Sequence, residues 1–236
     1  MNGTKISVIT VCYNAVSNIE ATIISVLGQV YENVEYIIID GGSDDGTVDI
    51  IKKYSEKITA WISETDEGVY DAMNKGIDLA KGDWIYFLGA GDILLKVLDK
   101  MVPQLKNDKC IYYGDVYRED LQRIYDGRFP AYKLAVTNIC HQAIFYPATA
   151  LKKYRFNTRY RLLADHDLNM RCYGDKEFDF KYLPVLICIY EGDGVSAANI
   201  DPGFFADKMN VIRANFPLMI YVYARLRRAA ARLLKE

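Results

Sequence analysis

The chain has 236 residues, of which 51% are hydrophobic and 25% are charged, and its formal net charge is -2. These values are typical of an ordinary globular protein and do not suggest a nucleic-acid binder. The five cysteines are widely spread without a CxxC pair, which argues against a disulfide or zinc framework and favours a reducing compartment. We find no secretory signal and no apolar segment of the ~20 residues that a spanning helix needs, so we expect a cytosolic protein.

Strands and helices are predicted to alternate in the first part of the chain. Buried strands rich in β-branched and aromatic residues are predicted over 6–12, 34–40, 58–63 and 84–88. Helices are predicted between them, over about 18–27, 48–54 and 69–80. This alternation is typical of right-handed βαβ units, so we expect an α/β fold with a mostly parallel sheet flanked by helices.

The alternation becomes irregular after about Leu105. A hairpin over 110–117 and 123–125, and further strands over 143–146 and 183–190, predict antiparallel additions to the sheet. Another helix is predicted to begin near Leu163 and to end near Tyr173. We assign residues 1–198 to one domain and 199–236 to a C-terminal helical extension.

One carboxylate, Asp92, follows the aromatic strand over 84–88, after two glycines and an alanine. Ligands of open α/β sheets bind at the carboxyl ends of the strands, and flanking glycines let a bulky anion and its cation approach the backbone. Asp92 is therefore a candidate ligand for a divalent metal that clamps a diphosphate. The alternative is that Asp92 caps the next helix, which is expected over about 93–105.

Asp40 and Asp66 also lie where predicted strands end, so parallel strands would bring both acids and Asp92 to one edge of the sheet. Asp40 is suited to accept a hydrogen bond from a planar base or a ribose hydroxyl. Alternatively, it is a turn carboxylate that accepts from the amides of Gly41 and Gly42. Neither G-x-G-x-x-G nor a P-loop pattern occurs, so a dinucleotide enzyme or a kinase is poorly supported.

Six segments of the chain resemble the successive motifs of the family 2 glycosyltransferases. They are Ile6–Asn14, Ile38–Thr47, Asp66–Gly76, Phe87–Asp92, His141–Phe145 and Ala164–Asp167. The order and spacing of these motifs make the signal specific, whereas any one of them alone would be weak. The resemblance implies a GT-A fold, a nucleoside-diphosphate sugar donor whose base is usually uracil, and transfer of a hexose with inversion at the anomeric carbon.

The resemblance also implies roles for individual residues. Asp165 matches the catalytic base of the family, and Asp92 matches the acid that binds Mg²⁺ or Mn²⁺. The positions expected to bind the donor are Thr10, Tyr13, Asn14, Asp40, Gly41, Gly42, Asp66, Asp71, Asn74, Lys75 and Gly91. Three further residues are expected beside the acceptor or behind these groups: His141, Gln142 and Asp167.

Three features of the sequence bear on these roles. The metal motif contains a single acid, so the donor phosphates and water would supply most of the roughly six oxygen ligands of a hard cation. His141 either adds a nitrogen ligand, touches the phosphates or is a structural histidine. Asp165 and Asp167 are two residues apart and diverge on a helix, so we expect one of them to be structural, most simply as an N-cap, and Asp165 to be the base.

Two C-terminal helices are predicted on either side of Pro217, over about 202–216 and 218–234. The apolar residues of the last helix share one face: Met219, Val222, Tyr223, Leu226, Ala230, Leu233 and Leu234. Basic residues occupy the opposite side: Arg225, Arg228, Arg232 and Lys235. Such a helix either lies in an anionic membrane interface or packs on the domain with a solvated charged face. Membrane docking would suit a peripheral protein whose acceptor is a glycan or a polyprenyl-linked sugar, as in bacterial surface-polysaccharide assembly.

The leading hypothesis is therefore inverting glycosyl transfer, with a UDP-sugar as the expected donor. The alternative is a non-catalytic protein that binds nucleotide sugars or glycans and retains the fold, which the reduced metal motif makes conceivable. A nucleotidyltransferase would need a glycine loop with arginine and lysine after the first strand, and residues 13–16 contain neither basic residue.

Overall fold

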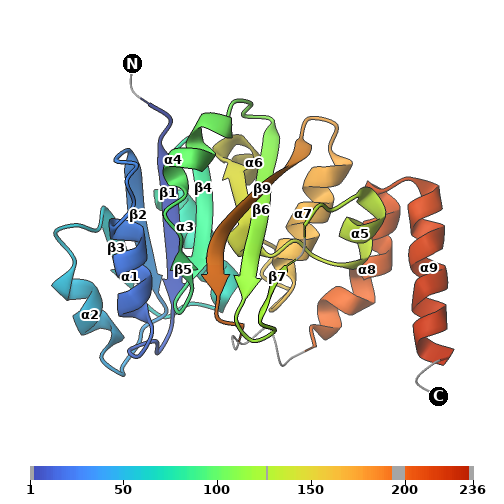
Figure 1. The fold of residues 1–236 in the computed structure, drawn as a ribbon. Helices are drawn as coiled ribbons and strands as arrows, with labels where there is room; N and C mark the ends of the chain where they lie inside the picture. The colour runs from blue at the N-terminus through green and yellow to red at the C-terminus, as the bar shows by residue number, and fades with distance from the viewer. Residues whose placement is uncertain (1–2, 126, 193–199, 234–236) are drawn as a thin grey trace.

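The computed structural model describes residues 3–125, 127–192 and 200–233. Its first half alternates strands and helices as the sequence predicts (Figure 1). The strands are β1 (Ile6–Cys12), β2 (Val34–Asp40), β3 (Ala60–Ser63) and β4 (Trp84–Gly89). The helices are α1 (Ile19–Leu27), α2 (Thr47–Lys53) and α3 (Val69–Leu79). β1 pairs in parallel with β2 and β4, and β2 with β3, which confirms the predicted parallel sheet.

The second half adds shorter elements to this sheet. Its strands are β5 (Ile93–Leu94), β6 (Cys110–Arg118), β7 (Arg123–Tyr125), β8 (Ile144–Pro147) and β9 (Asp179–Tyr190). Its α-helices are α4 (Leu98–Met101), α5 (Ala131–Val136), α6 (Ala148–Lys153), α7 (Ala164–Gly174), α8 (Pro202–Asn215) and α9 (Leu218–Leu233). Two 3₁₀ turns, η1 (Val102–Gln104) and η2 (His141–Ala143), complete the elements of the described residues. The short helices α5 and α6 were not predicted from the sequence.

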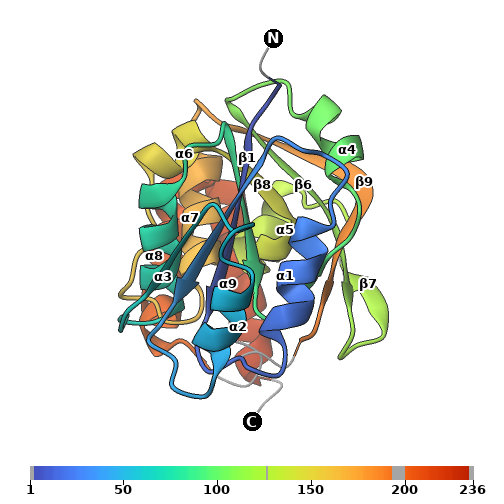
Figure 2. The same cartoon turned by 90° about the vertical axis from the view of Figure 1, so that its left-hand side faces the viewer.

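Within the described residues, the strands form one mixed sheet in the order β3-β2-β1-β4-β8-β6-β9-β5, with β7 paired to β6. β8 runs antiparallel to both of its neighbours, β4 and β6, which confirms that antiparallel strands join the sheet. Figure 2 shows α1 and α4 on one face of the sheet and α3, α6 and α7 on the other. Because both faces are covered, β1 and β4 are apolar along nearly their whole length.

Aromatic side chains fill the core where the two halves of the sheet meet. The rings of Tyr86 in β4 and Phe145 in β8 stack with their centroids 4.8 Å apart, and both side chains are fully buried. The Tyr86 hydroxyl donates to the carbonyl oxygen of Gln142 at 2.8 Å, just before β8. An aromatic pair contributes about 0.5–1.5 kcal/mol beyond its buried area, so these contacts fix β8 and the preceding turn η2 against β4.

The segment after β4 is not the helix that the sequence predicts over 93–105. It forms strand β5, which pairs antiparallel with β9, and helix α4 begins only at Leu98. The side-chain amide of Gln29 accounts for this difference. Its Nε2 donates to the carbonyl oxygen of Leu95 at 3.0 Å, and its Oε1 accepts from the amide of Val97 at 3.4 Å. These contacts satisfy backbone groups that an uninterrupted helix would pair internally.

The two C-terminal helices begin and end close to their predicted positions, although Leu234 lies outside the described residues. The boundary expected between residues 198 and 199 also lies outside them and stays a prediction. α8 packs on α7, and α9 packs on α5 and α8 at the edge of the molecule (Figure 1). None of the helices in the described part of the chain is long and apolar enough to span a bilayer.

Candidate functional site

The loops that follow the parallel strands start side by side at one edge of the sheet. Cys12 at the end of β1 pairs with Asp40 at the end of β2, and Asp40 pairs with Ser63 at the end of β3. Val11 pairs with Gly89 at the end of β4. The loops that carry most of the predicted donor residues therefore lie together, as expected for parallel strands.

Asp40 is fully buried, and its carboxylate meets several donors from the protein itself. Oδ2 accepts from the amides of Gly42 at 3.1 Å and Ser43 at 2.9 Å. It also accepts from the hydroxyl of Ser63 at 2.7 Å, while Oδ1 accepts from the Ser43 hydroxyl and the Cys12 thiol. Burial alone would raise the pKa of Asp40, but the hydrogen bonds from Ser43 and Ser63 outweigh it and hold the pKa below its ordinary value. A carboxylate has about four acceptor sites, so Asp40 is saturated. The turn-carboxylate alternative is right for the amide of Gly42, but the amide of Gly41 donates to the Cys12 carbonyl and Ser43 takes its place.

Another group of side chains remains accessible at this edge. Tyr13 is 66% exposed, and a Cβ built on Gly41 would lie 3.4 Å from its ring. The same Cβ would come within 2.7 Å of Oδ2 of Asp66. Oδ1 of Asp66 accepts from the amide of Gly68 at 2.8 Å, whereas Oδ2 has no hydrogen-bond partner among the described residues. An exposed ring and an available carboxylate oxygen thus converge on a glycine.

Thr10 and Asn14 are engaged by other parts of the protein. Thr10 is fully buried in β1, with its hydroxyl 3.1 Å from the hydroxyl of Tyr36, so it does not reach this edge. Asn14 has a left-handed φ of 48°, and its amide donates to Oγ of Ser43 at 2.8 Å. Its Oδ1 accepts from the amide of Asp44 at 3.2 Å. Asn14 therefore ties the loop after β1 to the loop after β2.

Of the α3 residues expected to bind the sugar donor, some are accessible and one is engaged by the protein itself. Nζ of Lys75 lies 3.6 Å from Asp71 and 2.9 Å from Glu64, and all three side chains are at least partly exposed. The side-chain amide of Asn74 instead forms two hydrogen bonds with the backbone of Phe156. Its Nδ2 donates to the Phe156 carbonyl at 3.0 Å, and its Oδ1 accepts from the Phe156 amide at 3.1 Å. Asp71 and Lys75 are thus available to a ligand, whereas the amide of Asn74 holds a neighbouring loop.

Asp92 is 3% exposed, and three protein donors surround its carboxylate. Oδ2 accepts from Nε2 of Gln142 at 2.8 Å and from the amide of Gly89 at 3.0 Å. Oδ1 accepts from the amide of Glu191 at 3.3 Å. Burial nevertheless raises the pKa of Asp92 to about 6, and no described lysine or arginine pairs with it. A buried carboxylate without a cationic partner fits a position where a divalent cation supplies the charge.

The protein itself offers few further ligands for such a cation. No group of three or more histidine, cysteine, aspartate or glutamate side chains placed to hold a metal occurs among the described residues. A cation at Asp92 would therefore need phosphates and water for most of its ligands, and that coordination stays a prediction.

Close approach explains why glycines precede Asp92. A Cβ on Gly89 would lie 2.8 Å from Oδ2 of Asp92. A Cβ on Gly91, whose φ is 106°, would collide with the carboxylate of Glu191. Glu191 itself accepts hydrogen bonds of 3.0 and 3.1 Å from Nδ2 of Asn18. Sequence reasoning missed Glu191, although it follows a predicted strand just as the other strand-end acids do.

Asp165 lies in the first turn of α7 and is 5% exposed. Its Oδ1 accepts from the hydroxyl of Tyr70 at 2.9 Å and from the amide of His166 at 2.8 Å. Its Oδ2 lies 3.3 Å from Nδ1 of His141. Burial would raise the pKa of Asp165, but the contacts with His141 and Tyr70 outweigh it and hold the pKa below its ordinary value. The carboxylate is therefore ionised at neutral pH, and Oδ2 retains room for one more donor.

Two consecutive residues of η2 join the candidate base to the candidate metal ligand. His141 contacts Asp165, and the next residue, Gln142, contacts Asp92. The two carboxylates therefore lie on either side of one short turn. Each of these η2 side chains contacts one carboxylate, and the role expected for each beside the acceptor or behind these groups stays a prediction.

Asp167 has a separate environment on the same helix. Its Oδ2 accepts from Nε of Arg171 at 2.8 Å, and burial raises its pKa. Asp165 and Asp167 diverge as expected, but the prediction that one of them is an N-cap is wrong. Leu163 occupies the cap position without a side-chain hydrogen bond, and the amide of Asp167 already donates to the Leu163 carbonyl at 3.2 Å. Both acids are thus inside the first turn.

Residues 7–182 match the family model described as Glycosyl transferase family 2. A Mycobacterium bovis protein named PGL/p-HBAD biosynthesis glycosyltransferase is 33% identical over 229 residues, which cover 93% of this chain and 90% of the relative.

Two solved structures share the fold. S. aureus TarS 1-349 in complex with UDP-GlcNAc has a TM-score of 0.75 at 19% identity, over 89% of this chain and 66% of that chain. The mannosyltransferase PcManGT from Pyrobaculum calidifontis, in complex with GDP-Man and Mn²⁺, has a TM-score of 0.65 at 16% identity, over 99% of this chain and 81% of that chain. The fold of the chain is therefore the expected α/β fold of GT-A type.

Proposed function

Because the chain belongs to glycosyl transferase family 2, we propose that it transfers a sugar from a UDP-sugar to an acceptor hydroxyl with inversion at the anomeric carbon. The carboxylate pair that His141 and Gln142 join is the observation that carries this proposal. The pKa of Asp165 is lowered and that of Asp92 is raised, so the two acids suit different tasks at one edge of the sheet.

Asp165 acts as the general base in this proposal. The acceptor hydroxyl donates to Oδ2, the oxygen with remaining capacity, and its proton passes to the carboxylate as the hydroxyl oxygen bonds to the anomeric carbon. The bond from that carbon to the diphosphate breaks on the opposite face, and UDP leaves with the electron pair. Tyr70 and His141 hold the carboxylate in place and ionised.

The base of the donor lies between Tyr13 and Asp66 in this proposal. The exposed Tyr13 ring offers a surface on which uracil can stack, and Oδ2 of Asp66 can accept from a base N–H. Gly41 leaves the space between them open, while Asp40 holds the loop from within. UDP-GlcNAc in TarS supports a uridine donor.

Asp92 is the residue that would hold Mg²⁺ or Mn²⁺, with the donor phosphates and water as the other ligands. The charge of the cation would stabilise the leaving diphosphate. The raised pKa of Asp92 and the Mn²⁺ bound by PcManGT support this assignment. Gln142 and the amide of Gly89 fix the orientation of the carboxylate.

We further propose that the last helix brings the site to a glycan acceptor carried on a lipid. α9 packs on the domain through Ile220, Tyr221 and Ala224, yet it leaves an apolar stripe exposed on its outer side. Met219 is 85% exposed in that stripe and Leu226 66%. A cationic helix with an outward apolar stripe suits an anionic membrane interface.

Turnover of candidate donors tests the central proposal. The protein is incubated with UDP-GlcNAc, UDP-glucose or UDP-galactose and Mn²⁺, with and without glycan acceptors, and released UDP is measured. We expect turnover that Asp165→Asn lowers by about 10²- to 10⁴-fold, while the surface control Asp99→Asn retains it. NMR of the product gives the anomeric configuration. Donor binding without turnover on any acceptor would instead indicate the non-catalytic alternative.

A further inference from the structure

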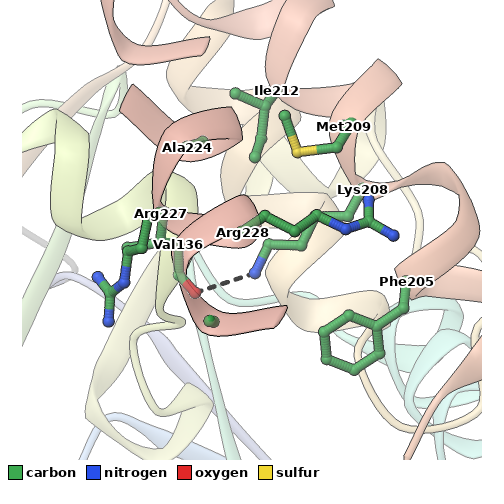
Figure 3. Close-up of a pocket in the computed structure, with 9 residues that line it drawn as sticks. Val136, Phe205, Lys208, Met209, Ile212, Ala224, Arg227 and Arg228 are labelled. Carbon is green, nitrogen blue, oxygen red and sulfur yellow. Dashed lines mark hydrogen bonds between the residues drawn. The ribbon is translucent and has the colours of Figure 1, made fainter. Parts of the chain in front are cut away.

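A cavity of about 200 Å³ lies between α5, α8 and α9 (Figure 3), and none of its lining residues belongs to the site described above. Its walls are mostly apolar: Val136, Phe205, Met209, Ile212, Ala224 and Ala231. Its polar lining consists of cations: Lys208, Arg227 and Arg228. Among the described residues no acid lines the cavity, so the charges that these residues bring to it are all positive.

Lys208 carries a charge that the described part of the chain leaves without a carboxylate. Its Nζ donates to the carbonyl oxygen of Val136 at 2.9 Å, and no described acid lies within ion-pair distance. Burial lowers the pKa of Lys208 to about 8, and the charges of Arg227 and Arg228 contribute to the same shift. Holding an ammonium partly away from water beside like charges is unfavourable, and a bound anion would relieve this cost.

The side chains of Arg227 and Arg228 lie at different places relative to Lys208. Figure 3 shows Arg228 lying across the stem of Lys208, whereas Arg227 extends on the other side of Val136. Neither arginine forms an ion pair with a described carboxylate, and both are exposed. Lys208 and Arg228 therefore present two cationic groups beside one apolar cavity.

We propose that this cavity binds an anionic amphiphile, a phosphate or carboxylate group joined to a short hydrocarbon chain. Lys208 and Arg228 contact the anionic group, and the apolar walls take the chain. The cavity is smaller than the ~300 Å³ of the smallest pockets that enclose a drug-sized ligand, so it accommodates a headgroup and the first part of a chain. This binding site is additional to glycosyl transfer and does not depend on it.

Hexyl phosphate tests the proposal, because inorganic phosphate and hexanol each carry only half of its chemistry. In calorimetric titrations of the whole chain we expect hexyl phosphate to bind at one site at least about tenfold more tightly than either fragment. Methyl NMR is expected to show shifts at Met209 and Ile212, which line the cavity. UDP should not displace the ligand. Absence of saturable binding, or displacement by UDP, would overturn the proposal.

Variants locate the binding independently of the spectra. Arg228→Gln should weaken hexyl phosphate at least about tenfold, and because the Arg228 side chain is exposed, the fold should be retained. Ala231→Leu narrows the cavity and should weaken the ligand without changing charge. Arg213→Gln, an exposed charge on α8 that does not line the cavity, is the matched control and should stay within about twofold. If Arg228→Gln and Arg213→Gln weakened the binding of hexyl phosphate equally, the result would contradict a defined site.

Vesicles distinguish the two sources of such an anion. Phosphatidylcholine vesicles with and without phosphatidylglycerol are sedimented with the wild type and with Arg228→Gln. If Arg228→Gln loses both hexyl phosphate and the anionic vesicles, the ligand is a membrane lipid. If it loses hexyl phosphate alone, the ligand is a soluble amphiphile in the same cavity.

Discussion

The loop after β2 and the turn that joins Asp92 to Asp165 are both built on buried carboxylates, yet these carboxylates differ in what they can still bind. Asp40 receives hydrogen bonds from amides, hydroxyls and a thiol, which hold its pKa low. Asp92 receives only three hydrogen bonds from the described residues, and burial outweighs them and raises its pKa to about 6. Asp165 is ionised but leaves one oxygen partly available.

The difference lies in how many acceptor sites the protein leaves free on each buried carboxylate. All the acceptor sites of Asp40 are taken by donors of its own loop and of the neighbouring strands, so substitution there should affect the fold first. Asp92 and Asp165 have capacity left, so substitution there should affect ligands and chemistry first. Variants of these residues can break or sharpen this distinction.

The largest effect is expected for Asp165→Asn. An amide cannot accept the proton of the acceptor hydroxyl, so kcat should fall about 10²- to 10⁴-fold. Binding of UDP, measured by calorimetry, should change little because Tyr13 and Asp66 are intact. The matched control is Asp99→Asn on the surface of α4. A variant that lost donor binding as strongly as turnover would place Asp165 among the structural acids with Asp40.

The next effect is a loss of stability in Asp40→Asn. An amide group would point a donor at Ser43 and Ser63, so the free energy of unfolding at pH 7 should fall by about 3 kcal/mol. The pKa of Asp40 is lowered by folding, so its stabilising contribution is present above the ordinary aspartate pKa of 3.8 and is lost as pH falls through the pKa of the folded state. In urea unfolding, the difference in stability between the wild type and Asp40→Asn should therefore be smaller at pH 3 than at pH 7.

The exposed neighbour Asp44 gives the control for this loop. Asp44→Asn removes a charge from the same turn without touching the buried network, so its unfolding curve should match the wild type at both pH values. A neutral Asp40→Asn would mean that the network around this carboxylate stabilises little.

Asp92→Asn should raise the free energy of unfolding in the absence of metal, whereas Asp40→Asn should lower it. Folding raises the pKa of Asp92 from 3.8 to about 6, so the stability that its protonated form contributes is complete below pH 3.8 and is lost as pH rises through about 6. The shift corresponds to an upper bound of about 3 kcal/mol. In EDTA at pH 7.5 the free energy of unfolding of the variant should be about 1–2 kcal/mol larger, because its amide remains neutral. The gain stays below the bound because the amide oxygen can keep the bonds from Gln142 and Gly89, whereas the 3.3 Å contact with the Glu191 amide is lost.

Addition of metal should make the wild type more stable than Asp92→Asn. Mn²⁺ with UDP should raise the melting temperature of the wild type more than that of Asp92→Asn, since the carboxylate supplies the charge that the cation needs. Chelation by EDTA should remove this difference. Equal shifts with Mn²⁺ and UDP would argue that the cation binds elsewhere.

The smallest effect is expected for Gly41→Ala. The added Cβ would lie 2.7 Å from Oδ2 of Asp66, so this carboxylate, the proposed acceptor for the uracil N–H, would have to move. UDP binding should weaken about tenfold, which is about 1.4 kcal/mol, with little change in unfolding. Gly203→Ala is the control, since a Cβ there meets no atom closer than 3.6 Å. Unchanged UDP affinity would contradict the placement of the base between Tyr13 and Asp66.

The sequence by itself determined the parallel half of the sheet, because a strand covered on both faces must be apolar along its length. It also determined which loops meet, since parallel strands put their carboxyl ends at one edge. The helix expected over 93–105 failed because Gln29, distant in the chain, takes up the backbone groups of that segment. Local periodicity carries no record of such a contact.

The tertiary structure alone decided which acids are available to a ligand. Asp40, Asp66 and Asp92 look alike in the sequence, as carboxylates that follow apolar strands. Their capacity depends on donors that come from separate loops, such as Ser63 for Asp40 and Gln142 for Asp92. It likewise decided that α9 leaves Leu226 exposed and that Arg228 lines the same cavity as Lys208. Hydrogen-bond saturation and burial are properties of contacts between distant segments, so a pattern of neighbouring residues cannot specify them.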